Sequence, residues 1–432
     1  MEQATTTRAF MNSRGTRRWG VIADDYTGAT DVAAVSWRAG LETTIAFGAP
    51  TSELAVDVSD ATVIALKIRT AEVSAARSAA ANAVAWLMRR SVDRFYVKYC
   101  STFDSTPTGN IGPIVDEVMM STGALGALIC PAAPAHGRTV YKGHLFVGDS
   151  LLAETAMRHH PLTPMLDSNI VRVLRPQTSH EVQLMPREFM ALGAASIRRR
   201  LEELGGSEAR HVVADSLLSS DLATVAAAIP DSCLATGSAG LAAALAARMA
   251  PVRRARRSPR PLPPGRTIVV AGSCSAATLR QLGAMATACE SLYLSPVLAD
   301  TPEGLTAAAK HWLHKRAQGT EPLLIYSSAP LDERLATGHV FGAATADVLE
   351  QALSSAARYA VDELGFHRVV VAGGETSGAV VDGLGITSAS VIREEDLGVP
   401  WIAPTHRPDL ALLLKSGNFG RASLLVDAVA AI

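Results

Sequence analysis

The sequence predicts an α/β protein made of two α/β domains with mostly parallel sheets and an active-site cleft between the domains. Short apolar runs of strand type alternate with Ala-rich helical stretches, a pattern typical of parallel sheets covered by helices. At 432 residues the chain also exceeds the size that one hydrophobic core serves. A Pro- and Arg-rich stretch at 251–265 interrupts the pattern and is typical of a linker.

These observations divide the chain into four segments. We expect a disordered tail at 1–18, a first domain at 19–250, a semi-stiff linker at 251–265 and a second domain at 266–432. The arginines of the linker could bind nucleic acid or acidic partners, but a solvated linker explains them without such a partner.

In the first domain, each predicted strand leads toward a helix. The strand expected at 19–23 ends in an acidic turn, and Gly40 is a suitable C-cap for the helix expected at 31–39. Further strands are expected at 61–66, 94–99, 126–130 and 212–215, and further helices at 71–89, 112–120, 186–204 and after 240. The stretch at 149–169 is expected to be irregular.

The second domain repeats this alternation. Strands are expected at 267–271, 323–326 and 369–372, and helices at 276–288, 343–364, 422–432 and after the glycine-rich turn at 373–378. In such sheets the ligand site lies beyond the carboxyl ends of the strands, so the polar turns that follow the strands are the candidate site.

Composition limits the partners. Apolar residues make up 48% of the chain and charged residues 19%, which suits a folded globular protein. The net charge of −1 provides no broad field for nucleic acid or an anionic membrane, so we expect a small-molecule partner. A homo-oligomer is compatible with this composition, which does not decide the oligomeric state.

The cysteines and the N-terminus indicate the compartment. The cysteines are odd in number and never in the short paired spacing of a zinc or redox motif: Cys100, Cys130, Cys233, Cys274 and Cys289. We therefore expect reduced thiols in a cytoplasmic protein. No apolar run is long enough for a membrane span, and 1–18 lacks the apolar core of a secretory signal, although a transit peptide is an alternative.

The acidic turn at 24–31 carries the first candidate chemistry. Asp24 and Asp25 are adjacent carboxylates at the end of a buried strand, followed by small residues that allow a ligand to approach. Such a pair suits the deprotonation of a hydroxyl or the binding of Mg²⁺. The alternative is that these residues cap the next helix, which fits Asp31 best and also fits either member of the pair.

Three further polar segments follow strands of the first domain. Arg69 could provide a guanidinium fork for a substrate carboxylate. The loop at 98–110 is dense in hydroxyls and could hydrogen-bond a polyol, and the loop after the strand at 126–130 adds a histidine and an arginine. The candidates from these two loops are Lys98, Ser101, Thr102, Asp104, Ser105, His136 and Arg138. Taken singly, each could equally be a surface polar residue.

The second domain contains three glycine- and hydroxyl-rich turns, at 272–275, 373–378 and 415–420. Glycines let the backbone approach a ligand, and a helix that starts at such a turn points its N–H groups at an anion. One such turn is an ordinary α/β connection, but three in one domain favour a bound nucleotide. The candidate residues are Ser273, Ser275, Gly373, Gly374, Glu375, Thr376 and Gly417.

The absent motifs narrow the class of enzyme. The sequence has no G-x-x-x-x-G-K-[ST] P-loop, no G-x-G-x-x-G dinucleotide motif and no H-E-x-x-H zinc motif. A kinase built on this chain therefore lies outside the P-loop class.

With these residues assembled, the chain resembles the four-carbon acid sugar kinase family. The stretches at 23–31 and 373–378 are similar to the N-terminal and C-terminal signatures of that family. Those at 100–106, 110–113 and 415–420 are most similar to its 3-oxo-tetronate kinase branch. The long linker and the extended N-terminus depart from the family pattern and affect the domain boundaries rather than the chemistry.

The resemblance implies a sugar-acid-binding first domain, an ATP-binding second domain and phosphorylation of the 4-hydroxyl of 3-oxo-tetronate to give 3-oxo-tetronate 4-phosphate. Asp25, or alternatively Asp24, would act on the attacking hydroxyl. Mg²⁺ is expected on the ATP phosphates, and Glu375 is the one protein residue considered as its ligand. The alternatives are a D-threonate or D-erythronate kinase, or a non-catalytic sugar-acid or nucleotide sensor.

Overall fold

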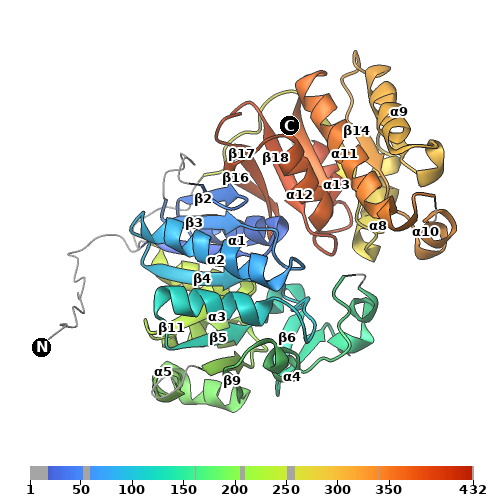
Figure 1. Ribbon diagram of the computed structural model, residues 1–432. Helices are drawn as coiled ribbons and strands as arrows, with labels where there is room; N and C mark the ends of the chain where they lie inside the picture. The colour runs from blue at the N-terminus through green and yellow to red at the C-terminus, as the bar shows by residue number, and fades with distance from the viewer. Residues whose placement is uncertain are drawn as a thin grey trace, which may run out of the picture.

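A single sheet of fifteen strands passes through the whole of the described molecule (Figure 1). The computed structural model describes residues 18–51, 59–160, 162–204, 210–250, 258–338 and 340–430. The tail predicted at 1–18 falls outside this set except for Arg18, and so does the part of the predicted linker at 251–257. The described ranges contain no helix long and apolar enough to cross a membrane.

The N-terminal half contributes eight parallel strands to this sheet. Their order is β2 (Thr43–Phe47), β3 (Ala61–Ala65), β1 (Trp19–Ala23), β4 (Arg94–Lys98), β11 (Cys233–Gly237), β5 (Gly126–Cys130), β10 (Arg210–Ala214) and β9 (Glu181–Met185). The strands predicted in this half are all present, whereas β2, β9 and β11 were not expected. β2 and β9 carry polar residues that shorten their apolar runs below a recognisable strand pattern.

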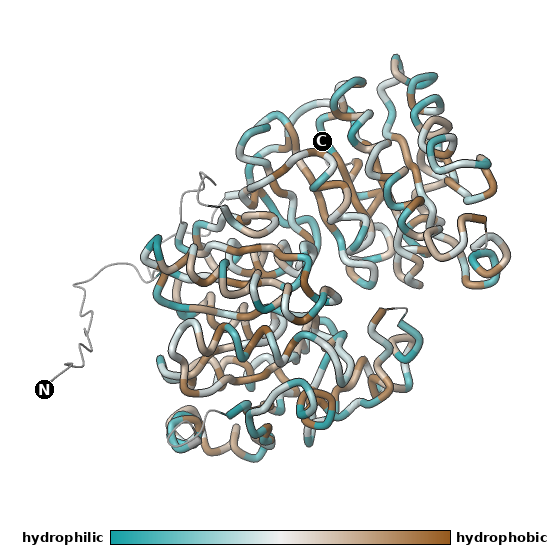
Figure 2. Tube along the Cα trace, viewed as in Figure 1, coloured by the Kyte–Doolittle hydropathy of each residue, from teal (hydrophilic) through white to brown (hydrophobic). Residues whose placement is uncertain are grey.

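Helices cover both faces of these strands, with their polar sides outward (Figure 2). They are α1 (Tyr26–Arg38), α2 (Val73–Met88), α3 (Ile111–Thr122), α4 (Ile170–Leu174), α5 (Gly193–Leu204), α6 (Ser219–Ala228) and α7 (Ala239–Met249). The prediction for the first helix was wrong at its start. Asp25 accepts a hydrogen bond from the N–H of Gly28 at 2.8 Å and so caps a helix that begins at Tyr26. Asp31 therefore lies inside the helix and is not its cap.

The C-terminal half contributes the other seven strands. Five are parallel, in the order β13 (Glu290–Tyr293), β14 (Leu323–Tyr326), β12 (Arg266–Ala271), β15 (Phe366–Ala372) and β18 (Ala411–Lys415). The other two, β17 (Val399–Pro404) and β16 (Ser388–Asp396), are antiparallel. The helices are α8 (Ala276–Ala286), α9 (Pro302–His314), α10 (Leu331–Thr337), α11 (Thr345–Asp362), α12 (Gly374–Gly383) and α13 (Leu424–Ala430).

The two halves are joined through β16 and β2, which pair in antiparallel fashion from Ser388 opposite Ala46 to Ser390 opposite Thr44. The predicted α/β class with mostly parallel pairing is confirmed, but the strands of the two halves form one sheet. Between β1 and β15 lie six strand-to-strand steps, over which the usual twist accumulates to roughly 120–150°. This twist allows the carboxyl ends of β1 and β15 to approach each other although the strand direction reverses along the sheet.

A separate three-stranded antiparallel sheet projects beside the carboxyl ends of the N-terminal strands. It consists of β6 (Arg138–Tyr141), β7 (His144–Val147) and β8 (Ser150–Leu151). A short 3₁₀ turn at Pro134–His136 precedes β6. The small sheet thus begins at the predicted site residues His136 and Arg138 and fixes their place at this edge.

Candidate functional site

Arg69 is surrounded by three carboxylates at the carboxyl end of β1. Its Nε and Nη2 both lie 2.9 Å from the carboxylate of Asp24, in a bidentate pair. Nη2 is also 3.0 Å from Oδ1 of Asp25, and Nη1 is 3.5 Å from Oδ2 of Asp104. The guanidinium fork that was predicted to bind a substrate carboxylate is therefore occupied by Asp24, and Arg69 instead holds the acidic residues in place.

Asp24 and Asp25 differ in environment although they are adjacent. The side chain of Asp24 is 4% exposed, whereas that of Asp25 is 22% exposed. Burial raises the pKa of Asp24 above its ordinary value, against the opposing effect of Arg69. Burial also acts to raise the pKa of Asp25, but Arg69, Lys98 and hydrogen bonds from Thr27 and Gly28 outweigh it and hold that pKa low. Asp25 is thus the accessible, ionised member of the pair.

Lys98 and Asp31 form a second buried pair behind Asp25. Their Nζ and Oδ2 atoms are 3.7 Å apart, and both side chains are almost fully buried. Burial raises the pKa of Asp31 to about 6, with Lys98 opposing this rise and Asp25 adding to it. The other oxygen of Asp31 has no hydrogen-bond partner.

The hydroxyl-rich loop predicted to bind substrate is held in a constrained conformation. Phe103 and Asp104 adopt positive φ angles of 64° and 31°, which turn the loop back toward Arg69. Thr102 donates a hydrogen bond of 2.6 Å to Asp104. Ser101 and Ser105 are also buried in this loop, and Ser105 donates to Gln177 over 3.3 Å. These side chains line the same strand edge as the acidic pair.

His136 and Arg138 lie where the N-terminal half meets the C-terminal half. The ring of His136 stacks on Phe419, with centroids 4.7 Å apart and planes 17° from parallel. Arg138 donates to the carbonyl of His136, and its Nε is buried without a hydrogen-bond partner. Burial, followed by the charge of Arg138, lowers the pKa of His136. Phe419 covers one face of the histidine that was predicted to contact substrate.

The three glycine turns of the C-terminal half meet at the ends of β12, β15 and β18. The N–H groups of Gly272 and Ser273 donate to the carbonyl of Ala372, at 3.1 and 3.2 Å. That of Gly373 donates to the carbonyl of Lys415 at 2.9 Å. The hydroxyl of Ser275 donates to Gly417 at 2.5 Å. The structure therefore brings together all three predicted turns.

Side chains are excluded from the centre of this cluster of turns. A Cβ at Gly272 would lie 2.3 Å from Oγ1 of Thr376, and one at Gly417 would lie 2.4 Å from Oγ of Ser273. Gly373 adopts a φ of 139°, which side chains rarely tolerate. Glycine is therefore required at these positions for the three turns to pack together.

The start of α12 faces the acidic turn of the other half. The first N–H groups of an α-helix have no intrahelical acceptor, and Gly373 supplies no side-chain cap for those of α12. A Cβ at Gly374 would be 3.9 Å from Oγ1 of Thr27 and 4.0 Å from Oδ2 of Asp25. Glu375 is exposed in the same turn. The two stretches singled out in the sequence thus lie face to face.

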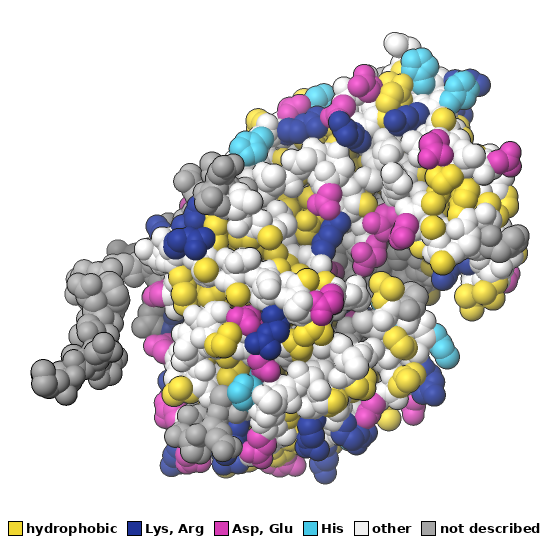
Figure 3. Space-filling view, viewed as in Figure 1, with side chains coloured by type: hydrophobic (Ala, Val, Ile, Leu, Met, Phe, Trp, Pro, Cys, Tyr) yellow, Lys and Arg dark blue, Asp and Glu magenta, His cyan; other side chains and the backbone are white. Residues whose placement is uncertain are grey.

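Two residues that sequence analysis missed connect the halves beside this point. The Nζ of Lys67 lies 2.7 Å from Oδ2 of Asp382 on α12, and the hydroxyl of Tyr26 donates to Oδ1 over 3.0 Å. The position of Lys67, directly after a predicted strand and two residues before Arg69, was the available signal. Figure 3 shows acidic side chains gathered where the halves meet on this face.

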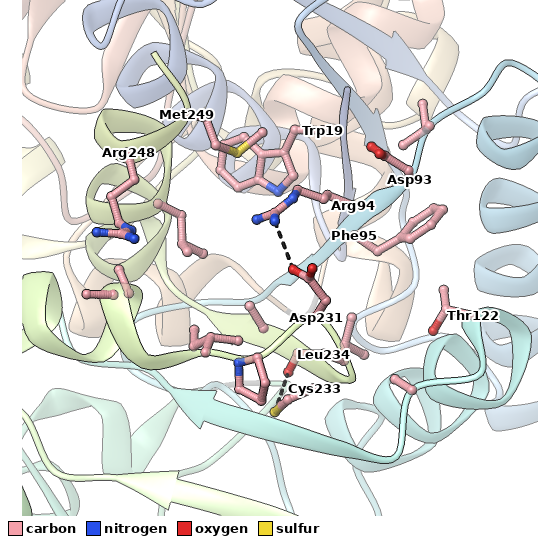
Figure 4. Close-up of a pocket in the computed structure, with 18 of the residues that line it drawn as sticks. Trp19, Asp93, Arg94, Phe95, Thr122, Asp231, Cys233, Leu234, Arg248 and Met249 are labelled. Carbon is pink, nitrogen blue, oxygen red and sulfur yellow. Dashed lines mark hydrogen bonds and ion pairs between the residues drawn. The ribbon is translucent and has the colours of Figure 1, made fainter. Parts of the chain in front are cut away.

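The described residues include no group of three or more His, Cys, Asp or Glu side chains placed to hold a metal ion. A pocket of about 850 Å³ exists elsewhere, at the opposite edge of the sheet (Figure 4). It is lined by residues that begin strands, among them Trp19, Arg94 and Cys233, and Arg94 pairs there with Asp231 at 2.8 Å. This pocket is separate from the turns described above.

Two family models match the chain. One, described as a sugar-binding N-terminal domain, matches residues 19–245. The other, described as a nucleotide-binding C-terminal domain, matches residues 268–425. The acidic turn falls within the first match, and all three glycine turns fall within the second.

Relatives match over nearly the full length. A 3-oxo-tetronate kinase from Burkholderia multivorans is 40% identical over 417 residues, which cover 96% of this chain and 97% of the relative. Another 3-oxo-tetronate kinase, from Pectobacterium atrosepticum, is 40% identical over 93% of this chain and 96% of the relative. A solved structure from Salmonella typhimurium, described provisionally as a tRNA synthase, is 36% identical and has a TM-score of 0.84. The match covers 95% of this chain and 98% of the solved chain.

The raised pKa of Asp31 predicts a pH-dependent stability difference. Above pH 3.8 the unfolded chain loses this proton, whereas the folded chain keeps it up to about pH 6, so Asp31 reduces stability as the pH rises across this range. Asp31→Asn removes the effect. Its free energy of unfolding relative to the native chain should therefore increase by up to about 3 kcal/mol between about pH 4 and pH 7.

Urea unfolding at both pH values measures this difference. Asp93→Asn, at an exposed position, is the matched control and should show no such increase. A constant difference between Asp31→Asn and the native chain across the pH range would contradict the raised pKa.

Proposed function

The chain belongs to the four-carbon acid sugar kinase family, the family of its 3-oxo-tetronate kinase relatives, and we propose that it transfers the γ-phosphoryl group of ATP to the 4-hydroxyl of 3-oxo-tetronate. The identity of about 40% extends over both halves of the chain. The match therefore includes the half proposed to bind the sugar acid and the half proposed to bind ATP.

The observation that carries the proposal is the approach of Gly374 to Asp25. The uncapped start of α12 is suited to a phosphate group, because its N–H groups and helix dipole favour an anion. The space at Gly374 opens directly toward the carboxylate of Asp25. An acceptor hydroxyl on Asp25 and a phosphoryl group at α12 would therefore be neighbours.

In the proposed reaction, the oxygen of the 4-hydroxyl forms a bond to the γ-phosphorus while the bond to the bridging oxygen of ADP breaks. Asp25 accepts the hydroxyl proton. Its low pKa makes it a weak base but keeps it ionised and able to orient the hydroxyl. That role is sufficient, because phosphoryl transfer depends mainly on positioning and charge stabilisation. Arg69 fixes Asp25 and Asp24 and takes no part in proton transfer.

The sugar acid would lie along the loop that contains Ser101, Thr102, Asp104 and Ser105. With the fork of Arg69 occupied by Asp24, we assign the substrate carboxylate to Arg138, which forms no ion pair with the described carboxylates. Lys98 adds positive charge at the same edge. The stack of His136 on Phe419 would then close the site on the nucleotide side.

ATP would be held by the three turns, through Ser273, Ser275, Gly373, Gly374, Thr376 and Gly417. Mg²⁺ would be bound by the ATP phosphates, and we assign it no protein ligand. Glu375 is exposed, and we assign it no contact with ATP. We locate the reaction in the cytoplasm, in keeping with ATP as the phosphoryl donor.

The proposed reaction predicts a preference among four-carbon sugar acids. In a coupled assay of ADP release, 3-oxo-tetronate should give a kcat/KM at least about tenfold above those of D-threonate and D-erythronate. A higher value for either of the other acids would reassign the substrate. Tight binding of all three without turnover would indicate a sensor and refute the kinase.

The proposed role of Asp25 as proton acceptor predicts a loss of turnover when its carboxylate is replaced by an amide. Asp25→Asn should lower kcat by about 10²–10⁴-fold, because the amide cannot accept the hydroxyl proton. The helix should still form, since asparagine is an equally good N-cap. Steady-state kinetics and circular dichroism measure both effects, with Asp93→Asn as the control. Full activity of Asp25→Asn would exclude Asp25 as the proton acceptor.

The proposed place of the phosphoryl group predicts that a side chain at Gly374 interferes with turnover. Gly374→Ala should lower turnover at least about tenfold, because the methyl group would enter the space between α12 and Asp25. Thermal stability should be unchanged or slightly raised, since no atom lies closer than 3.9 Å and alanine favours helix. Gly283→Ala, on α8 with no atom within 4 Å, is the matched control. Equal turnover of the two variants would count against this placement of the phosphoryl group.

A further inference from the structure

Lys415 is a fully buried lysine at the end of β18, next to the proposed nucleotide site. It follows Leu414 and lies on the side of the sheet covered by α8, where the core includes Leu413 and Met285. Its backbone carbonyl accepts the hydrogen bond from Gly373. The side chain therefore lies directly behind two of the three glycine turns.

The ammonium group of Lys415 is surrounded by neutral acceptors. Its Nζ lies 2.7 Å from Oγ1 of Thr278, 2.7 Å from Oε1 of Gln281 and 2.9 Å from the carbonyl oxygen of Gly417. Three acceptors match the three protons of a charged ammonium. The hydroxyl of Thr278 donates its own proton to Gly417, so a neutral amine, with only two protons, would direct its lone pair at one of these oxygens. The hydrogen-bond geometry thus favours the charged form.

No described carboxylate forms an ion pair with this ammonium. Ionisable residues of the surrounding elements are either exposed, engaged elsewhere or at the far end of a strand: Arg280 on α8, Asp31 and Arg38 on α1, His367 and Arg368 on β15, Glu375 and Asp382 on α12, and Asp427 on α13. Burial without a counter-charge lowers the pKa of Lys415 to about 7. Its desolvation and its hydrogen bonds therefore oppose each other.

The contacts of Lys415 determine the shape of the third turn. The carbonyl of Gly417 also accepts hydrogen bonds from Ser275 and Thr278. The amide of Gln281, which accepts from Lys415, donates to three carbonyls of the same segment, those of Phe419, Gly420 and Arg421. Through Phe419 this turn reaches the stack with His136 of the other half. Protonation of Lys415 is thus connected to the geometry of the nucleotide site.

We propose that Lys415 is a positioning residue of the nucleotide site and that nucleotide binding is coupled to proton uptake by its amine. The inference rests on the proposed ATP site. A polyphosphate held by the turns at 272–275 and 417–420 would supply the negative charge that the buried ammonium lacks. The proton taken up comes from solvent and completes the three hydrogen bonds that hold Gly417.

Titration calorimetry with Mg·ADP tests this coupling. At about pH 8, measurements in buffers of different ionisation enthalpy should reveal uptake of roughly 0.5–1 proton per nucleotide, falling toward zero near pH 6. Above pH 7 the dissociation constant should rise about tenfold per pH unit, because the amine is then mostly neutral and must take up a proton when the nucleotide binds.

Two variants separate the positioning role from general damage. Lys415→Arg keeps a charge that does not titrate, so its proton uptake and its pH dependence of affinity should both disappear. Lys415→Met should also show no uptake and should bind Mg·ADP at least about tenfold more weakly than the native chain near pH 6, and this difference should shrink as the pH rises above 7. Lys315→Met, an exposed lysine of the same half, is the matched control and should behave as the native chain does. Circular dichroism verifies folding of each variant.

The outcomes distinguish this inference from the proposed function. Failure of the folded native chain to bind Mg·ADP or Mg·ATP at any pH would refute the proposed nucleotide site. Binding without proton uptake by the native chain, or with the same uptake in Lys415→Arg, would overturn the inference and leave the kinase proposal standing. Where a variant fails to fold, absence of proton uptake by the native chain still overturns the inference.

Discussion

The antiparallel pairing of β16 with β2 is the constraint on which the arrangement of the site depends. It joins the strands of both halves into one sheet and leaves α1 packed against both, in contact with β16, β17 and α12. The ion pair between Arg38 and Glu394 fixes the far end of α1 on β16. With its position determined in this way, the start of α1 carries the acidic turn to the start of α12.

The two helix starts that meet there are complementary. At the start of α1 the carboxylate of Asp25 satisfies the N–H of Gly28, so this end already has its anion. At the start of α12 the glycine cap supplies no side-chain acceptor, and the N–H groups remain available to a ligand. One helix thus presents a carboxylate and the other presents donors across the same gap, which suits an acceptor hydroxyl on one side and a phosphate on the other.

Buried charge is distributed differently in the two halves. In the N-terminal half Asp24, Asp25, Asp31 and Asp104 surround Arg69 and Lys98, so the carboxylates outnumber the cations and two of them have raised pKa values. In the C-terminal half Lys415 is buried among neutral acceptors only. In our proposal an anionic ligand near Lys415 would compensate its charge, whereas Arg69 and Lys98 offset part of the charge of the carboxylates that surround them. Desolvation would then favour ligand binding in one half, while in the other half ion pairs within the protein oppose it.

Local sequence patterns determined the α/β class, several of the central strands and the candidate turns, because β1 and the segment 369–372 of β15 are apolar runs followed directly by aspartate or glycine. Strands with polar residues, such as β2 and β9, were missed for the same reason. Only the tertiary structure decided that Asp25 caps α1, that Asp24 occupies the fork of Arg69, and that Phe419 covers His136. These contacts join residues that are distant in sequence, and they depend on the direction in which each strand and helix is packed, which no local pattern specifies.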